Sequence, residues 1–374
     1  MMKILGKTNY KNRIIWILAA FFLWYMVVSS FLTLFQESLQ DHLFPNPSPA
    51  MAFVLEYYAL TLSSVVVFFL VCWLTKKNRF LLDVVKPTAK RRSMSKLGAG
   101  ILLGFLTNFF CILCALLHGD IKLYLDFSSS QIPVMIFAFI CVFIQSSSEE
   151  IWCRVFMYDR INVHYPLWVA IVVNGVVFGL LHSFNDGITA LAMADLIICG
   201  LAYSLLRWYS GSIWTCFGIH TMWNFTQNFL FGLPNSGLVS EASVYHLDAV
   251  NAVSNWCYSY EFGVEGAVPA VFIDLLLIVV IMVMAAKKGR LGELTESLES
   301  RGLAPAEPVR KTGKTMKMAA ANEPDMDIET VTAADDAPAA KADAKAAASE
   351  SDMDAGMAAD TATDEDPLVV EFEE

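Results

Sequence analysis

The chain has 374 residues, of which 56% are hydrophobic and 17% are charged, and its mean hydropathy is +0.50. Soluble domains are typically about 45–50% apolar and about 25% charged, so a single ordinary soluble domain is excluded. The net charge of −11 is uneven: Met318–Glu374 holds 17 acidic residues and two lysines, a net of −15, which leaves about +4 for the rest. No basic face or aromatic–basic motif is present, so nucleic acid is not expected as a partner.

Eight apolar runs approach the roughly 20 residues that a helix needs to cross a bilayer. They are Ile14–Leu34, Met51–Thr75, Leu97–Leu117, Ile132–Met157, Pro166–Ser183, Ile188–Leu206, Ser212–Phe231 and Ala267–Ala286. The predicted fold class is therefore all-α, a polytopic transmembrane helix bundle of about eight spans over residues 1–290. The first run is longer than the apolar part of a signal peptide and lacks a small-residue cleavage site, so it is predicted to remain as a span.

Lysine and arginine alternate between the loops that join these runs. Several lie before the first run and after the second and eighth, and one arginine follows each of the fourth and sixth runs, Arg160 and Arg207. Lys122 is the only lysine or arginine in the other long loops, which are Gln36–Ala50, Gly119–Gln131 and Gly232–Gly266. Because basic loops stay in the cytoplasm, the pattern predicts a multi-pass integral membrane protein with both termini cytoplasmic.

Composition changes after Arg290. Residues 291–374 are rich in Ala, Asp, Glu, Thr and Pro and nearly lack aromatic residues. Such a segment cannot bury enough apolar surface to offset its ordering entropy, so a disordered acidic cytoplasmic tail is predicted, more as a spacer than as a binding site for a basic partner. Seven of the eight cysteines lie in apolar runs and are predicted to be small buried side chains, including Cys111 and Cys114.

Ionisable residues inside a membrane helix are costly and are functional candidates by default. In this chain most polar residues of the spans gather in the fourth, fifth and seventh runs. They are Ser146, Ser147, Ser148, Glu149, Glu150, Arg154, Asn174, His182, His220, Asn224, Gln227 and Asn228. Glu56, Asp195 and Asp274 stand alone on three other runs and are interpreted as packing or cavity residues.

Helical geometry separates the two adjacent glutamates. Glu150 and Arg154 are four residues apart, share a face and are predicted to form an ion pair. Glu149 points about 100° away, toward Gln145, Ser146 and Cys153. An unpaired carboxylate in an apolar setting suits a general base. The alternative is that both glutamates only join helices.

The pairs Phe178–His182 and His220–Asn224 have the same four-residue spacing, so each pair presents one face. A lone membrane histidine more often joins helices by a hydrogen bond, but two histidines, a glutamate and an asparagine together favour one site. At about 1.5 Å rise per residue, His182 lies several ångströms farther from the cytoplasmic side than Glu149. A common site therefore requires tilt or a later membrane entry of the fifth helix.

Three motifs now stand in order: E-E-x-x-x-R at Glu149–Arg154, F-x-x-x-H at Phe178–His182 and H-x-x-x-N at His220–Asn224. Each is unspecific alone, but together they resemble the CPBP intramembrane proteases over Ser129–Phe231. That family includes the type II CAAX prenyl endopeptidases and Abi-like bacterial proteins tied to bacteriocin maturation or self-immunity. The remaining runs, the Gly232–Gly266 loop and the tail are not covered by the resemblance.

The resemblance implies a role for each matched residue. Glu149 would activate water with the help of His182, and His220 and Asn224 would form the oxyanion hole. Glu150, Arg154 and Phe178 would support the site. Many bacterial members have glycine after the motif arginine, where this chain has Val155, which bears on local packing.

The family has been described as metalloproteases, and Glu149, His182 and His220 form a donor set known for catalytic zinc. The same residues also work as a metal-independent glutamate protease, and this reading without a cofactor is favoured.

The sequence therefore predicts an intramembrane endopeptidase, a hydrolase that acts on a membrane-associated or lipidated substrate in contact with membrane lipid. The alternatives are a non-catalytic membrane immunity or receptor protein and a small transporter. A transporter predicts an internal repeat, and none is visible. Rhomboid-like and presenilin-like enzymes are excluded, because Gly211-Ser212 does not fit the serine motif and Asp195 and Asp274 lack the G-x-G-D context.

Overall fold

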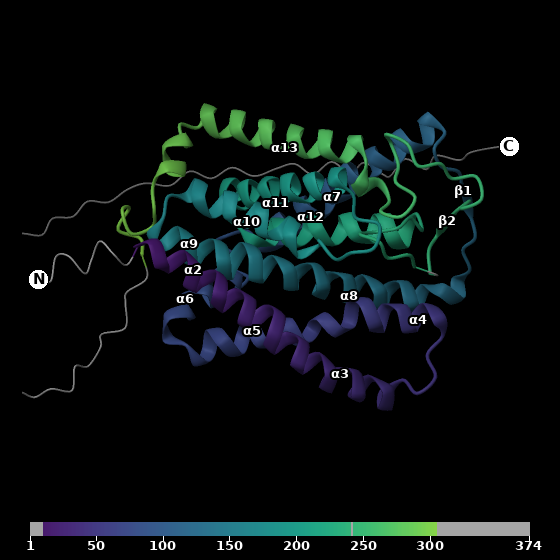
Figure 1. Cartoon of the computed structure of the whole chain (residues 1–374), viewed down its shortest axis with the longest axis horizontal. Coiled ribbons are helices and arrows are strands. Elements are labelled where there is room, and N and C mark those ends of the chain that lie inside the picture. The colour runs from purple at the N-terminus through teal and green to yellow at the C-terminus, as the bar shows by residue number, and fades with distance from the viewer. Residues whose placement is uncertain (1–9, 241, 305–374) are drawn as a thin grey trace, which may run out of the picture. The chain divides into compact units, whose positions relative to one another are not determined.

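The computed structural model of the protein describes residues 10–240 and 242–304, which belong to one compact unit. These residues form a helix bundle with one small sheet, which confirms the predicted all-α class (Figure 1). In chain order the elements, with η for π or 3₁₀ turns, are α2 (Tyr10–Phe21), η1 (Phe22–Val28), α3 (Ser29–Leu43), α4 (Pro49–Phe53), η2 (Val54–Tyr58), η3 (Ala59–Thr61), α5 (Leu62–Leu74), η4 (Lys76–Asn78), α6 (Phe80–Val85), α7 (Ser93–His118), β1 (Leu123–Leu125), η5 (Ser129–Gln131), α8 (Ile132–Glu150), η6 (Ile151–Met157), α9 (Tyr158–His164), α10 (Leu167–Leu181), α11 (Ala190–Ser210), α12 (Ile213–Phe225), η7 (Thr226–Leu230), β2 (Tyr245–Leu247), η8 (Val264–Gly266), α13 (Val268–Lys287) and η9 (Leu291–Thr295).

All eight predicted spans are helical in the structure. Among the described residues, six helical stretches are long and apolar enough to cross a membrane. They are Arg13–Leu43, Pro49–Leu74, Ser93–His118, Ser129–His164, Ala190–Ser210 and Val268–Lys287. The fifth predicted span is the shorter helix α10, and the seventh is α12 continued by η7. These helices support an integral membrane protein, whereas the number of spans and the cytoplasmic termini stay predictions.

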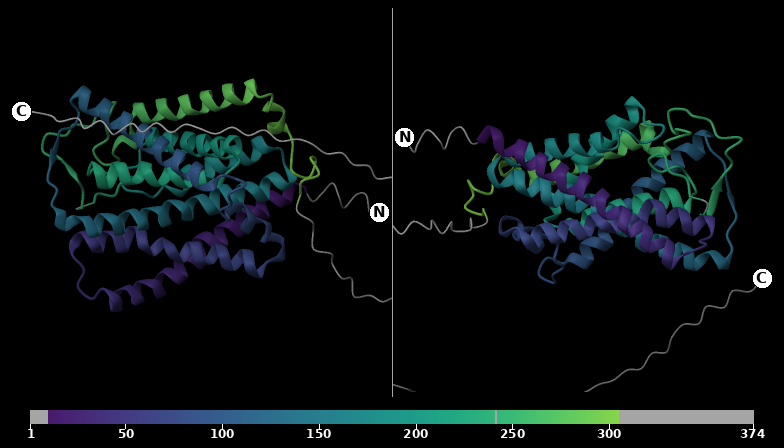
Figure 2. Two further views of the ribbon diagram at one scale, coloured as in Figure 1. Left: turned by 180° about the vertical axis from the view of Figure 1, so that it is seen from behind. Right: turned by 60° about the horizontal axis from the view of Figure 1, so that its bottom comes forward.

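Large apolar side chains are exposed on the outer helices. Trp16, Phe31 and Phe35 are 72–73% exposed on α2 and α3, and Phe272 and Val279 are 55% and 56% exposed on α13. Figure 1 places α13 on one side of the bundle and α2, α3 and α5 on the other, with α8, α11 and α12 between them, and the view from behind in Figure 2 keeps this order. Apolar faces of this extent are typical of contact with lipid.

Glycines set the distance between the central helices. A Cβ atom at Gly100 or Gly104 of α7 would lie 2.2 or 2.3 Å from a backbone carbonyl oxygen of α12, and one at Gly218 of α12 would lie 2.4 Å from a carbonyl oxygen of α7. Likewise, a Cβ at Gly200 of α11 would lie 2.8 Å from the Cα of Gly175 on α10. Small residues four apart allow such close helix contacts in membranes, and here they fix the helices that carry the predicted site.

The two ends of the bundle are built differently. At one end, residues 291–304 pack against α9 and α10 through backbone hydrogen bonds such as Leu298 N to Asn162 O (2.9 Å) and Leu167 N to Glu296 O (3.1 Å). Residues 291–304, which the sequence assigned to the tail, are therefore packed against the bundle, because these bonds anchor them. The predicted tail over 305–374 lies outside the described residues. At the other end β1 and β2 pair antiparallel, with Tyr124 opposite His246.

Candidate active site

A cavity of about 260 Å³ lies within the bundle. The four residues predicted to be catalytic, Glu149, His182, His220 and Asn224, all line it, and so does Phe178. The helices α8, α10 and α12 thus bring the three sequence motifs to one site. His182 reaches this site in spite of its predicted height, at the point where α10 ends.

Glu150 is the buried centre of an ion-pair network. Arg154 Nη1 donates to Glu150 Oε1 over 2.9 Å, and both side chains are fully buried, so the predicted ion pair is present. His220 Nδ1 lies 2.9 Å from the same oxygen. An ionised carboxylate only accepts hydrogen bonds, so this contact assigns the Nδ1 proton to His220 and orients its ring. The π-helical turn η6 begins directly after Glu150, and such turns are frequent at functional sites.

Glu149 has a different environment. Its Oε1 accepts a hydrogen bond of 2.5 Å from Gln145 Nε2, one helical turn earlier. Its Oε2 is buried without a hydrogen-bond partner and lies 3.8 Å from His220 Nε2. His220 therefore stands between the two glutamates, with one ring nitrogen on each. One glutamate is neutralised and the other keeps a free oxygen, as the helical geometry predicts.

The Phe178 ring contacts Arg154 and both histidines of the site. The Arg154 guanidinium lies 3.9 Å from the centre of the Phe178 ring, a cation–π contact that adds to the Glu150 ion pair. The His182 and His220 rings lie 4.9 and 6.1 Å from the same ring. His182 Nδ1 is 2.9 Å from the Phe178 carbonyl oxygen, to which it donates, so this histidine is held at the end of α10.

Asn224 belongs to a hydrogen-bond chain that reaches Glu149. Its Nδ2 donates to Gln145 Oε1 over 3.2 Å, and Gln145 in turn donates to Glu149. Asn235 Nδ2 lies 3.4 Å from Asn224 Oδ1 on the other side. The helical spacing predicts that Gln145 and Glu149 share a face, but only the packing of α8 on α12 shows that Gln145 links two candidate catalytic residues.

The loop between η7 and α13 covers part of the cavity, a role that no motif in the sequence indicated. Asn235, Ser236 and Glu265 line the cavity. Glu265 accepts hydrogen bonds from Trp223 Nε1 (2.9 Å), Asn235 Nδ2 (2.9 Å) and both the backbone N (2.9 Å) and Oγ (2.8 Å) of Ser236. Burial raises the pKa of Glu265 above its usual range, while the hydrogen bonds from Ser236 and Trp223 oppose that shift.

Other polar residues of the predicted cluster do not line the cavity. Asn174 donates to the Cys153 carbonyl oxygen and accepts from Ser204, which ties α10 to its neighbours. Gln227 donates to the Pro234 carbonyl oxygen over 2.6 Å, and Asn228 donates to two carbonyl oxygens of the same loop. These side chains therefore hold the covering loop and the helices in place.

The alternative zinc set of Glu149, His182 and His220 does not fit a metal ion as the residues are arranged. Zinc bonds of about 2.0–2.3 Å require all ligand atoms to lie close together. Glu149 and His220 approach each other, but the described residues contain no group of ligand atoms within 4.8 Å of one another that includes His182 with both of them. His182 also uses Nδ1 for the Phe178 carbonyl oxygen.

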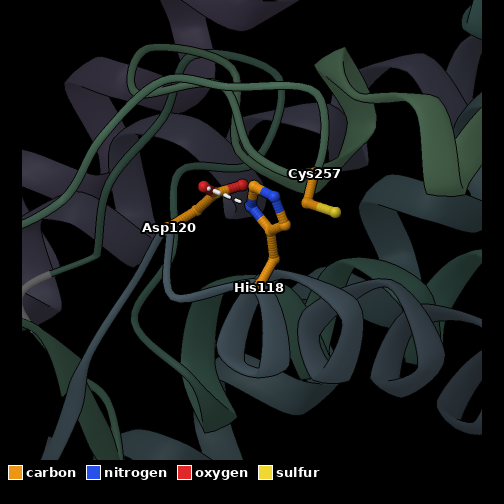
Figure 3. Close-up of side chains that lie close together, drawn as sticks. All are labelled: His118, Asp120 and Cys257. Carbon is orange, nitrogen blue, oxygen red and sulfur yellow. Dashed lines mark hydrogen bonds and ion pairs between the residues drawn. The ribbon is translucent and has the colours of Figure 1, made fainter.

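The described residues do contain one such group elsewhere, His118, Asp120 and Cys257, at the end that holds the sheet (Figure 3). His118 Nδ1 lies 2.8 Å from Asp120 Oδ1, and Trp256 Nε1 donates to His118 Nε2 over 3.0 Å. Both ring nitrogens are therefore satisfied in a neutral imidazole. The cluster is explained as a link between the end of α7 and the covering loop.

Asp195 and Asp274 also line the cavity and are 3% and 5% exposed. From the sequence they were interpreted as packing or cavity residues, and the structure shows that they line the cavity. Asp195 comes from α11 and Asp274 from α13, so the cavity wall combines carboxyl groups from α8, α11, α13 and the covering loop.

The comparison with protein families supports the general class of the protein. Residues 129–226 match the family model described as type II CAAX prenyl endopeptidase Rce1-like. The resemblance to the CPBP proteases is confirmed for this segment, about a quarter of the chain, which contains all seven residues of the three motifs. The match supports a CAAX-type intramembrane protease as the general function, with a peptide or lipidated substrate in the membrane. Comparisons with curated proteins and with solved structures gave no match.

Proposed function

We propose that the protein is an intramembrane endopeptidase that hydrolyses a peptide bond of a membrane-associated or lipidated substrate with water activated by Glu149. The observation that carries the proposal is the buried, unpartnered Oε2 of Glu149, which faces His220 Nε2 across 3.8 Å in the cavity. A single water molecule bridges groups at such a separation. The family match of residues 129–226 supports the same reaction class.

In the proposed mechanism Glu149 takes a proton from this water, and the water oxygen attacks the carbonyl carbon of the peptide bond. The carbonyl oxygen becomes an oxyanion, which the second N–H of the Asn224 amide and a doubly protonated His220 stabilise. Glu149 then gives its proton to the leaving nitrogen as the C–N bond breaks. His182 helps to hold the water. Gln145 is hydrogen-bonded to both Glu149 and Asn224 and so holds the two side chains in position relative to each other.

We propose that this reaction needs no metal, because every step uses a group that the cavity already holds. Glu150 and Arg154 support the site indirectly, since they orient His220 and Phe178. Incubation with a chelator should then leave the rate unchanged, and a rate restored only by added zinc would contradict this part of the proposal.

The test uses the reconstituted full chain and a mixed library of free and lipidated peptides, with products identified by mass spectrometry. Glu149→Gln should reduce cleavage by up to about 10⁴-fold, the upper range of general acid–base catalysis. Cleavage by Glu149→Gln at the wild-type rate would contradict the mechanism.

Glu56→Gln is the matched control, because Glu56 is an exposed carboxylate in a membrane helix and does not line the cavity. Its activity should equal that of wild type. Thermal unfolding of both variants shows that a lost activity is not a lost fold.

A further inference from the structure

The cavity has a second feature that the proposed hydrolysis does not use, a pair of aspartates on the wall formed by α11 and α13. Asp195 and Asp274 are both at least 95% buried and interact electrostatically with each other. Cys199 also lines the cavity, and its thiol interacts with the Asp274 carboxyl group. Buried carboxyl groups inside a membrane protein are costly and mark functional sites.

Among the described residues that line the cavity, no lysine or arginine compensates this pair. The described residues that line the cavity include four carboxyl groups, Glu149, Asp195, Glu265 and Asp274, but neither lysine nor arginine. Arg154 lies behind Phe178 and is engaged by Glu150. The two histidines of the cavity are already engaged, His220 by Glu150 and His182 by the Phe178 carbonyl oxygen at the end of α10.

The carboxyl groups of the cavity also differ in how well they are hydrogen-bonded. Glu265 accepts four hydrogen bonds from the covering loop and Trp223, and Glu149 accepts one from Gln145. Asp195 Oδ1, in contrast, is buried without any hydrogen-bond partner. A buried polar atom without a partner is rare in a folded protein, and this one lies where a bound group would supply the missing donor.

The arrangement of the carboxyl groups indicates which kind of ligand the Asp195–Asp274 wall would bind. A basic group suits two buried carboxyl groups, because it brings both hydrogen-bond donors and a positive charge. A metal ion needs several ligand atoms close together, and the described part of the chain offers no such group of three at this wall. A protonated amine or guanidinium needs only one or two carboxylates, and its alkyl stem suits the apolar part of the cavity.

We propose that Asp195 and Asp274 form a subsite for a basic group of the substrate, the ammonium of a lysine or the guanidinium of an arginine close to the bond that is cleaved. This inference rests on the proposed function, because it names the substrate class of the same cavity. A second role follows for the pair: it excludes substrates that place an acidic side chain at this position.

The experiment uses apolar hexapeptides, acetylated and amidated at their ends, in which one Lys, norleucine or Glu is moved through every position. Wild type should cleave the best Lys peptide with a kcat/KM about 10- to 100-fold above that of its norleucine partner, the range of a hydrogen bond to a charged group. Asp195→Asn and Asp274→Asn should each reduce this ratio toward one, because the amide no longer distinguishes an ammonium group from a methyl group. Glu56→Gln should keep the ratio. Free N-terminal amines in place of the acetyl group show whether an amine at the chain end also binds.

A binding arm keeps the two proposals distinguishable. The same peptides are titrated onto the Glu149→Gln protein, with and without Asp195→Asn, so that affinity is measured without turnover. If wild type cleaves no peptide, the proposed function fails, but tighter binding of Lys than of norleucine peptides that depends on Asp195 still supports the subsite.

Equal binding and cleavage of Lys and norleucine peptides by wild type would overturn the subsite while the protease stands. A preference for Lys that survives both Asn variants would overturn it too. The third contrary outcome is a divalent cation, detected by elemental analysis, that wild type retains and Asp195→Asn loses without any preference for Lys.

Discussion

Helix α11 carries two buried charged residues with opposite surroundings, and their difference separates structural from functional charges. Near its end, Arg207 Nη2 binds Asp159 Oδ2 over 2.6 Å, and its guanidinium lies 4.4 Å from the Tyr158 ring centre. Near its beginning, Asp195 lines the cavity and has an oxygen without a partner. The same helix thus has a compensated charge at one end of the bundle and an uncompensated one in the cavity.

Other charged residues show the same contrast between the α9 end of the bundle and the cavity. At the α9 end, Arg290 is bound to Glu293 and to two carbonyl oxygens of α11. In the cavity, the pair formed by Glu150 and Arg154 orients His220, while Glu149 keeps a free oxygen. Paired charges hold elements together at little net gain, whereas unpaired ones remain available for a ligand or a proton.

The largest expected effect is at the paired end. Arg207→Ala leaves Asp159 as a buried carboxylate without its partner and should lower stability by about 3–5 kcal/mol, measured as a large fall in the thermal midpoint of the purified protein. Arg301→Ala serves as the control, because Arg301 is an exposed partner of Glu296 at 3.7 Å and its loss should cost about 0–1 kcal/mol.

A double variant sharpens this result. Asp159→Leu with Arg207→Met removes both charges and should recover much of the lost stability, because neither charge is then left unpaired. Equal midpoints for Arg207→Ala and wild type would mean that the α9 end does not depend on its ion pair, and the contrast with the cavity would fail.

An intermediate effect is expected at the covering loop, where Glu265 is an acidic residue of the cavity that is fully hydrogen-bonded. In Glu265→Gln one oxygen becomes an NH₂ group that faces the donors of Ser236 or Asn235, which should cost about 1–3 kcal/mol locally. We expect faster hydrogen exchange over residues 233–238 and about 10-fold weaker peptide binding. Unchanged exchange there would show that Glu265 does not hold the loop.

The smallest effect concerns Glu293, which accepts hydrogen bonds from Arg290 and from Trp208 Nε1 (2.9 Å). The hydrogen bond from Arg290 holds the pKa of Glu293 below its ordinary value of 4.5. A lowered carboxyl pKa contributes stability above pH 4.5, and this contribution is lost as the pH falls below 4.5 through the lower folded-state pKa.

The contribution is expected to be within about 1 kcal/mol, because the pair is partly exposed. The thermal midpoint of wild type minus that of Glu293→Gln should therefore shrink between about pH 6 and about pH 3. A difference that stays constant over this range would contradict the assignment.

Much of the fold and of the site could be predicted from local spacing. Length and hydropathy define the membrane helices, and four-residue spacing pairs Glu150 with Arg154 while it turns Glu149 away. The two G-x-x-x-G spacings, Gly100–Gly104 and Gly175–Gly179, are a signal in the sequence for the close helix packing that the structure shows. Residues 291–304 could not be assigned from composition, because backbone hydrogen bonds to α9 and α10 order them.

That this chain is an apolar helical protein with three motifs on three helices follows from its sequence, since these properties depend on residues within a few turns of one another. Which isolated acidic residues face the motifs depends on how the helices pack. Asp195, Glu265 and Asp274 come from three separate elements, and nothing in their local sequence distinguishes a cavity wall from a helix contact. Their role arises from helices brought together by packing, which is a property of distant residues.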